Sequence, residues 1–280
     1  MGGGMSSTVA KRAMVLLLGL AMLAVCGLGT AQAAILRIGG TGAATELMKR
    51  LGAAFERHEP GVTVEVIPGL GSSGAISATM DGALDIAVSA RPLKKAEAEA
   101  GLASAPFART PYGMVTSHPN PGDIAAADLA AFFASVTSTW PDGTPVRVIL
   151  RPLSESDTAL LGATFPGMAE ALDQVRARPD VSVAATDQDN LDMAADVDGS
   201  LVGTSLAQVV TEGRRLQFLS IDGVAPSVEA VEAGRYPYVK LFHMVLADAP
   251  DPHVARFITF IRSDAGVAIL REAACLPITN

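Results

Sequence analysis

Three loops rich in glycine and hydroxyl side chains have the composition of a binding site for a small anion. They lie at residues 39–42, 69–74 and 151–158, and each connects a stretch typical of a strand to one typical of a helix. The N-terminus of a helix leaves several backbone N–H groups without partners and carries about half a positive charge, so it attracts anions. One such loop alone is usually a helix cap. Three of them, with Ser89 and Arg91 following a nearby strand-like stretch, favour a shared site.

The sequence lacks the patterns that mark catalytic and metal sites. It has no Gly-x-Ser-x-Gly elbow and no His-Glu-x-x-His motif, and its four histidines show no metal-ligand spacing. Asp187, Asp189 and Asp192 lack the spacing and central glycine of an EF-hand loop, so we expect a solvated loop there. Glu155 and Asp157 could do acid–base work, but acids are ordinary at the start of a helix. We therefore expect no enzyme, no metal and no cofactor.

Alternating strands and helices must position the three loops. Residues 35–38, 62–66 and 84–89 are typical of strands, and the apolar residues between 47 and 55 have the spacing of one helical face. This order of strand, loop and helix predicts a mainly parallel sheet with helices on its faces. The pattern continues with strands expected at 111–117 and 146–150 and helices expected at 128–133 and after the cap at Asp251-Pro252.

Composition limits the kinds of protein that this chain can be. Hydrophobic residues make up 49% of its 280 residues and charged residues 18%, which excludes a disordered chain and allows a sizeable core. The 29 acidic and 21 basic residues give a net charge of −8, so we expect no nucleic-acid partner. No low-complexity linker separates two halves. Any two domains should therefore share strands across a hinge.

The first 33 residues have the pattern of a secretory signal peptide. Lys11-Arg12 precedes an apolar run from 13 to 28, and Ala31-Gln32-Ala33 supplies the small residues of a cleavage site. The run is short for a membrane anchor, so we expect cleavage after Ala33 and a periplasmic protein. A lipid anchor on Cys26 is less favoured, because Val25 is a poor match to the small residue that such signals carry there. Cleavage would leave Cys275 without a disulfide partner and change the net charge to −10.

A series of short motifs along the rest of the chain resembles one family. Each motif is weak alone, but their order and spacing resemble the phosphate-type periplasmic substrate-binding proteins of ABC importers, which have the type II periplasmic-binding-protein fold. The resemblance covers most of the chain after residue 33. The motifs are residues 69–74, 84–93, 140–145 leading into Arg151, 221–227, 234–237, and 257–263 followed by Gly266 and Leu276-Pro277.

The resemblance implies an α/β protein of two lobes that close over an oxyanion. Each lobe would have a mixed, mainly parallel sheet with flanking helices, and two hinge crossovers would join the lobes. Lobe 1 would comprise residues 34–113 and 237–280, and lobe 2 would comprise residues 114–236. A small anionic ligand and a membrane ABC permease would be the partners, and we expect a monomer.

The family's site residues carry over by motif. Ser72 matches the serine of the Gly-Ser-Ser-Gly loop, Ser89 the serine after the third strand, and Arg151 the site arginine, while Thr41 lies near the first ligand loop. Arg91 either reaches into the cleft or pairs with an acid at its rim. The full set of expected ligand-binding residues is Thr41, Gly42, Ser72, Ser73, Ser89, Arg91, Arg151, Glu155 and Ser156.

Two departures from the family pattern leave the ligand open. Phosphate receptors commonly have an aspartate at the position of Ala90, where it accepts the proton of hydrogen phosphate. Glu155 and Asp157 also replace small or hydroxyl residues after Arg151. Two charges about 4 Å apart repel by roughly 4 kcal/mol at an effective dielectric of ~20, whereas an arginine hydrogen bond to a charged partner contributes only about 1.5–3 kcal/mol. An ionised Glu155 facing a bare dianion would therefore cancel Arg151.

Three interpretations of Glu155 remain. It turns outward and caps the helix, it supplies the acceptor missing at Ala90, or the ligand is not phosphate. The expected function is capture of phosphate or a similar small oxyanion and its delivery to an ABC importer. The alternative is a ligand-sensing protein of the same fold that docks on a membrane receptor and binds something other than phosphate.

Overall fold

Strands and helices alternate along the chain, as the sequence predicts. The computed structural model describes residues 34–248 and 250–278, and the predicted signal peptide and Cys26 lie outside the described residues. From Ile35 onward the chain forms one compact unit. No helix of the described part is long and apolar enough to cross a membrane.

The strands are β1 (Ala34–Gly40), β2 (Val62–Ile67), β3 (Ile86–Ser89), β4 (Leu102–Thr116), β5 (Asp123–Ile124), β6 (Arg147–Leu150), β7 (Ser182–Val183), β8 (Ser200–Ser205), β9 (Gln217–Phe218), β10 (Ser220–Ile221), β11 (Val239–Ala247) and β12 (Leu276–Pro277).

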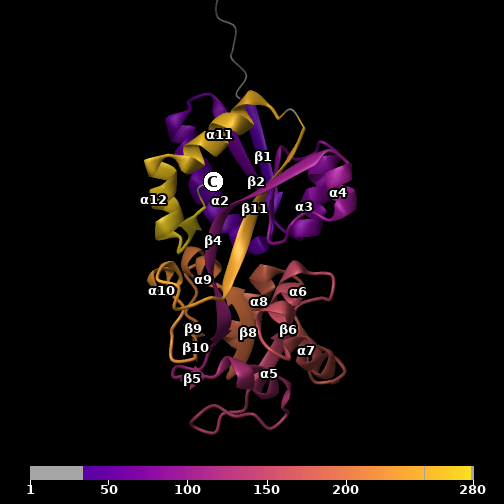
Figure 1. Cartoon of the computed structure of the whole chain (residues 1–280), viewed down its shortest axis with the longest axis vertical. Coiled ribbons are helices and arrows are strands. Elements are labelled where there is room, and N and C mark those ends of the chain that lie inside the picture. The colour runs from indigo at the N-terminus through magenta and orange to yellow at the C-terminus, as the bar shows by residue number, and fades with distance from the viewer. Residues whose placement is uncertain (1–33, 249, 279–280) are drawn as a thin grey trace, which may run out of the picture. The chain divides into compact units, whose positions relative to one another are not determined.

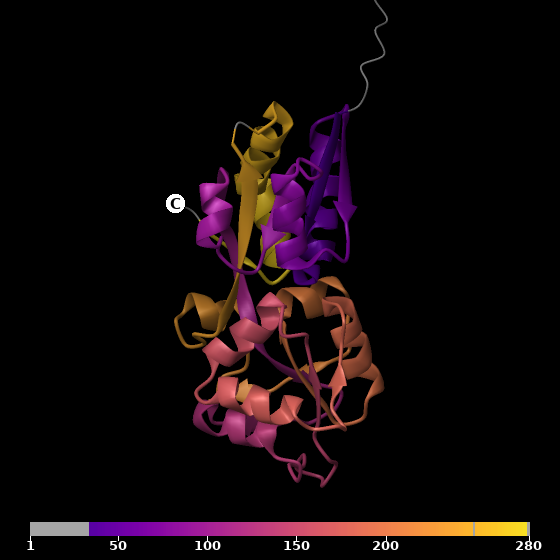
Figure 2. The same ribbon diagram turned by 90° about the vertical axis from the view of Figure 1, so that its right-hand side faces the viewer.

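Helices follow most of the strands and cover the sheet (Figures 1 and 2). Several have their ends fixed by recognisable caps; Asp251, for example, accepts a hydrogen bond from the His253 N–H at the start of a helix whose first residue is Pro252. The helices are the 3₁₀ turn η1 (Gly42–Ala44), α2 (Thr45–His58), α3 (Gly71–Met80), α4 (Lys95–Glu99), α5 (Ala126–Ala134), α6 (Ser156–Thr164), α7 (Met168–Arg176), α8 (Asp187–Asp196), α9 (Leu206–Thr211), α10 (Val228–Glu232), α11 (Pro252–Arg262) and α12 (Asp264–Glu272).

The sheet is mixed, which confirms the expected α/β architecture. Its main path runs β2-β1-β3-β11-β4-β8-β6-β7, with β9 and β12 also paired to β4. The pairs β1–β3, β6–β8 and β6–β7 are parallel. Each antiparallel pair among the described strands includes β4 or β11, the two long strands that cross the middle of the sheet. Figure 1 shows these two strands running between an upper and a lower group of elements.

The apolar core is divided between the same two groups of elements. One cluster packs α2, α11 and α12 against β1, β3 and the first part of β4 and includes Phe55 and Phe257. Another packs α5 and α7 against β8 and the last part of β4 and includes Tyr112 and Trp140. Trp140 is buried and donates from its indole nitrogen to the Gly199 carbonyl at 3.0 Å, so it is a packing anchor. The lobe boundaries at 113/114 and 236/237 stay a prediction.

The two long strands are also held together by a tyrosine. Tyr236 is buried just before β11, and its hydroxyl donates to the Tyr112 carbonyl on β4 at 3.0 Å. A β-carbon at Gly113 would lie only 2.6 Å from that hydroxyl, so the close approach requires glycine there. This contact packs Tyr236 against the strand that crosses the middle of the sheet.

Candidate functional site

A small cavity brings parts of all three glycine- and hydroxyl-rich loops together. It has a volume of about 40 Å³ and is partly open. Its lining includes backbone from two of the loops, the guanidinium of Arg151, and the first residues of α8. The lining residues are Gly42, Gly69, Leu70, Gly71, Arg151, Glu155, Ala185, Thr186, Asp187 and Gln188.

A larger cavity of about 190 Å³ lies between β4, β11, α11 and α12. Its walls are mostly apolar side chains such as Phe107, Leu246 and Ile261. Size alone would favour it, but it has few donors for a charged ligand. We therefore place the candidate anion site at the smaller cavity around Arg151.

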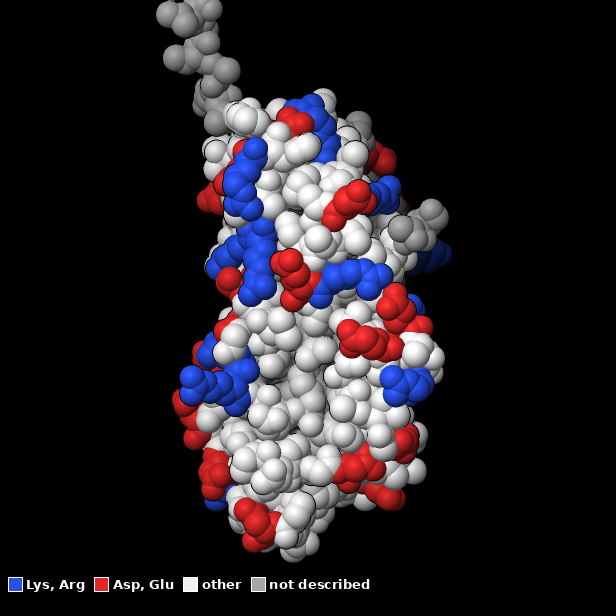
Figure 3. Space-filling view, turned by 90° about the vertical axis from the view of Figure 1, so that its left-hand side faces the viewer, with Lys and Arg blue, Asp and Glu red and all other residues white. Residues whose placement is uncertain are grey.

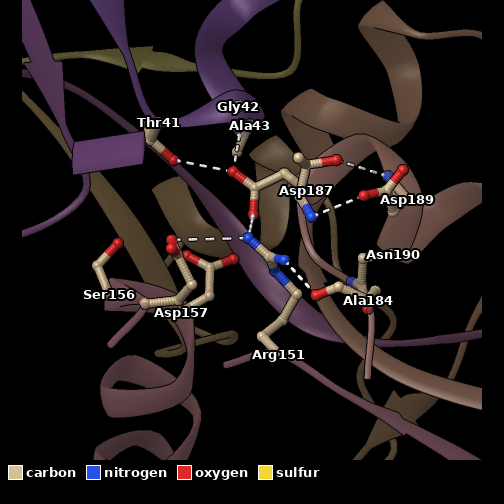
Figure 4. A network of polar contacts seen from close by, with 12 residues as sticks. Thr41, Gly42, Ala43, Arg151, Ser156, Asp157, Ala184, Asp187, Asp189 and Asn190 are labelled. Carbon is tan, nitrogen blue, oxygen red and sulfur yellow. Dashed lines mark hydrogen bonds and ion pairs between the residues drawn. The ribbon is translucent and has the colours of Figure 1, made fainter. Parts of the chain in front are cut away.

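Arg151 is the buried cation of this site. It directly follows β6, and only 8% of its surface is exposed. One Nη atom donates to the Ala184 carbonyl at 2.6 Å, and the other lies 3.3 Å from Asp187 Oδ1 and 3.6 Å from Glu155 Oε2 (Figure 4). Its Nε is buried without a partner among the described residues. The guanidinium is thus held by a carbonyl on one side and by two carboxylates on the other.

The loop after β1 provides the donors from the other side of the site. The Thr41 hydroxyl donates to Asp187 Oδ2 at 3.2 Å, and the Ala43 N–H donates to the same oxygen at 2.9 Å. The Gly42 carbonyl accepts from the Gln188 side-chain amide at 3.0 Å. A β-carbon at Gly42 would lie 2.8 Å from Asp187 Oδ2, so glycine permits this close approach. The donors of this loop therefore meet a carboxylate of the chain itself.

The solvated loop expected around Asp187, Asp189 and Asp192 is wrong. Asp187 begins helix α8 and is 7% exposed, and the Thr186 hydroxyl and the Asp189 carboxylate form a capping box there. Thr186, which is followed three residues later by the acid Asp189, is a helix-start signature that is visible in the sequence. The Asp187 partners Thr41 and Ala43 are about 145 positions away, and no local pattern could show them. No cluster of metal-ligating side chains occurs among the described residues.

The N-terminal ends of α3 and α6 meet at the same place. The Ser72 hydroxyl lies 3.2 Å from the Ser156 hydroxyl and accepts from the Ala90 N–H at 3.0 Å. Ser72 is buried and Ser156 half-buried. The two helix starts thus bring two hydroxyl groups together, and the start of a helix is a place that attracts an anion.

Glu155 faces the site rather than the solvent. It is the N-cap residue of α6, but its side chain makes no capping hydrogen bond, so the interpretation of Glu155 as an outward cap is wrong. Its carboxylate lies near Arg151 and Gly71 instead. Burial raises the pKa of Glu155, and the positive charge of Arg151 only partly opposes this. The other two interpretations of Glu155 remain open.

Asp157 has a buried partner that the sequence did not reveal. Lys240 on β11 is fully buried, and its Nζ donates to Asp157 Oδ1 at 2.6 Å. Burial raises the pKa of Asp157, and the Lys240 ammonium works against that shift. The signal for Lys240 was a lone lysine inside a mostly apolar strand, where a charge is costly without a partner.

Three of the expected site residues lie in a separate group. Arg91 pairs with both oxygens of Glu97, at 2.7 and 2.8 Å, and donates to the Ser73 hydroxyl at 3.1 Å. The Ser89 hydroxyl donates to the Arg91 carbonyl at 2.7 Å. The Arg91 guanidinium also lowers the pKa of Glu97. Of the expected set, Gly42, Arg151 and Glu155 line the cavity and Thr41 contacts Asp187, which also lines it, whereas Ser72 and Ser156 contact each other and Ser73, Ser89 and Arg91 form this rim group.

The chain matches a known family over most of its length. Residues 28–265 match the family model described as the PBP superfamily domain. A search of curated proteins finds no match.

Many solved structures are similar to the chain in fold. One is a phosphate ABC transporter substrate-binding protein with bound phosphate from Clostridium perfringens, with 20% identity and a TM-score of 0.76 over 88% of this chain and 100% of the other. Another is an ABC-type phosphate transport receptor from Vibrio cholerae, with 19% identity and a TM-score of 0.64 over the same shares. A third is the periplasmic molybdate-binding protein of Azotobacter vinelandii, with 15% identity and a TM-score of 0.58 over 88% and 99%. At these identities the similarity establishes the two-lobed fold.

Proposed function

The chain belongs to the PBP superfamily, and on this premise we propose that it captures a small oxyanion at Arg151 and delivers it to a membrane importer. The observation that carries the proposal is the convergence around one small cavity of donors from three loops. These are the Arg151 guanidinium, the donors at residues 41–43, and the starts of helices α3 and α6. A buried arginine with hydrogen-bond donors on the opposite wall suits a planar or tetrahedral anion.

Local donors rather than overall charge would select the ligand. The chain carries a net charge of −8, and on the face in Figure 3 basic and acidic side chains are interspersed over a largely uncharged surface. Charges farther than about 8 Å are screened at physiological salt, so the groups that line the cavity dominate. An acidic protein can therefore bind an anion.

Glu155 favours an oxyanion that carries a proton or a hydroxyl group. With alanine at position 90, Glu155 is the carboxylate in the cavity that could accept a hydrogen bond from the ligand, since Asp187 already accepts from Thr41 and Ala43. Hydrogen phosphate offers such a proton, whereas sulfate does not at neutral pH. Of the three structural neighbours named above, two are phosphate proteins and one is a molybdate-binding protein, so the class of tetrahedral oxyanions is the substrate class that we propose.

Export and transport complete the proposal. The signal-like residues 1–33 would direct the chain out of the cytoplasm, and the neighbours from Clostridium perfringens and Vibrio cholerae are ABC transport proteins. The partner would be an ABC permease, with the protein acting as a monomeric carrier and no enzyme. A sensing role on a membrane receptor would use the same site, and co-purification with a permease or a receptor distinguishes the two.

A thermal-shift screen tests the binding function. We expect phosphate or another tetrahedral oxyanion to stabilise the protein by about 2.7 kcal/mol at 100-fold excess over Kd, following RT ln(1 + [L]/Kd). Arg151→Ala should abolish the response. Arg178→Ala is the matched control, because Arg178 pairs with Asp180 and does not line the cavity. Equal responses to all anions, or a response retained by Arg151→Ala, would contradict the proposal.

A further inference from the structure

We propose that Asp187 is an internal competitor of the ligand, so that an oxyanion binds by displacing its carboxylate from the donors of the site. The inference rests on the proposed function and adds to it a residue that sets which anions bind and how tightly. The two groups of donors that should hold the ligand, on the loop after β1 and on Arg151, both contact this one carboxylate.

The Asp187 carboxylate uses both of its oxygens in these contacts. Oδ2 accepts from the Thr41 hydroxyl and the Ala43 N–H, and Oδ1 lies 3.3 Å from the Arg151 guanidinium. Figure 4 shows the carboxylate between the loop on one side and the guanidinium on the other. A hydroxyl, a backbone N–H at a helix start and a guanidinium are the donor types that bind an oxyanion, and a carboxylate presents similar acceptor oxygens.

The sequence is adapted to hold Asp187 in this position. Gly42 lacks the β-carbon that would collide with Asp187 Oδ2 at 2.8 Å and with the Gln188 side-chain oxygen at 2.7 Å. Gln188 donates to both the Gly42 carbonyl and Glu212, and the Thr186 capping box fixes the start of α8. The contact is therefore supported by neighbours on both sides and is not an incidental surface pairing.

Charge explains why ligand and carboxylate should exchange rather than coexist. Asp187, Glu155 and Asp157 place three carboxyl groups around two cations, Arg151 and Lys240, and Lys240 already pairs with Asp157. An incoming oxyanion would have to share Arg151 with two acids in a buried setting, where like charges repel strongly. Removal of the Asp187 charge should release Arg151, Thr41 and Ala43 for the ligand.

Exchange also predicts which ions compete best. An anion with two charges gains more from Arg151 than a single carboxylate does, so phosphate or sulfate should displace Asp187 better than acetate or formate. When the side chain of residue 187 is shortened, a small carboxylate should fit the space that Asp187 occupied. Formate binding that appears only in the shortened variant would be a direct sign of this.

Calorimetric titration of phosphate into the full chain and its variants tests the inference. We expect Asp187→Asn and Asp187→Ala to bind phosphate roughly 10- to 100-fold more tightly than the unsubstituted protein, the range of one or two charge-assisted hydrogen bonds. Asp187→Ala should also bind formate measurably. Asp192→Asn is the matched control, since it removes the same charge from the exposed side of α8, where Asp192 pairs with Arg214, and it should leave the affinity unchanged.

The outcomes separate this inference from the proposed function. If Arg151 is needed for phosphate binding but both Asp187 variants bind phosphate equally or more weakly, the exchange is wrong while the function stands. Weaker binding would make Asp187 a direct ligand contact. If the unsubstituted protein and every variant bind no anion, both proposals fail. Circular dichroism checks folding, and Asp187→Asn, which preserves the shape of the side chain, gives the result if Asp187→Ala does not fold.

Discussion

Arg151 is within 3.3 Å of Asp187 and 3.6 Å of Glu155, so two acids share a single guanidinium. Their surroundings give them different roles. Asp187 is almost fully buried and accepts from Thr41 and Ala43, whereas Glu155 is more exposed, has no hydrogen-bond donor among the described residues, and has a raised pKa. The Asp187 oxygens thus already accept from donors of the chain, whereas Glu155 keeps acceptor capacity for a ligand.

Glu155→Gln should alter selectivity between oxyanions. If an ionised Glu155 accepts the proton of hydrogen phosphate, glutamine at this position weakens phosphate binding and strengthens sulfate binding, because the repulsion of the bare dianion is removed. Titration of both anions into the variant and the unsubstituted protein checks this. Unchanged affinity for both ions would show that Glu155 does not contact the ligand.

The same residue predicts a pH dependence. The pKa of Glu155 is raised by burial, so the carboxylate is lost at a higher pH than an ordinary glutamate loses it. As the pH falls through this raised pKa, the acceptor disappears and phosphate affinity should decrease in the unsubstituted protein. The affinity of Glu155→Gln should lack this step, as measured by titrations between about pH 4 and 7.

At the scale of elements, the buried Lys240–Asp157 pair connects strand β11 to helix α6. Lys240 has no exposed surface, and Asp157 is almost fully buried. Removing one partner of a buried pair leaves the other charge without compensation, which typically costs more than the intact pair contributes. The pair therefore holds the helix that carries Glu155 and Ser156 against a strand that crosses the sheet.

Lys240→Met should lower the free energy of unfolding by about 3–5 kcal/mol at neutral pH. In the variant, Asp157 is buried without its cation, so its already raised folded pKa rises further above the unfolded value and its ionisation opposes folding more strongly. The deficit should therefore shrink as the pH falls toward about 4, where the unfolded carboxyl also takes up a proton. Denaturant unfolding at pH 7 and pH 4.5 measures this.

Lys49→Met is the control for that experiment. Lys49 pairs with Glu46 on the exposed surface of α2, with half of the lysine side chain accessible. Exposed pairs of this kind contribute at most about 1 kcal/mol, so a small and nearly pH-independent change is expected. If the two lysine variants lost similar amounts of unfolding free energy, burial would not make the Lys240–Asp157 pair more important for stability than an exposed pair.

Local sequence patterns predicted the elements well and the site in part. Alternating valines, helical spacing and the Asp251 cap gave β2, α2 and α11, because each depends on residues close together in the chain. They also placed Arg151 directly after a strand, at the candidate site. The pairing of Asp187 with Thr41 could not be predicted, since it depends on how two distant loops pack.

At the scale of the whole molecule, β4 and β11 join two apolar cores and place loops from both beside Arg151. The buried part of the fold begins with β1 at Ala34, whose central residues Leu36 and Ile38 lie in the first core. Residue 34 is also the first residue after the predicted cleavage point. No linker is therefore needed between the predicted signal peptide and the first strand.

The mature protein should begin at Ala34 and leave the cytoplasm without a lipid anchor. Cleavage after Ala33 leaves β1 intact, so the processed chain retains every strand of the described fold. Intact-mass measurement of protein from the periplasmic fraction should give the mass of residues 34–280. Ala33→Leu should block processing, since a large side chain replaces the small residue at the cleavage site, while Cys26→Ala should change neither the mass nor the fraction. A mature chain that starts at Cys26 and carries a lipid would contradict this prediction and make the protein membrane-anchored, leaving the anion site itself unaffected.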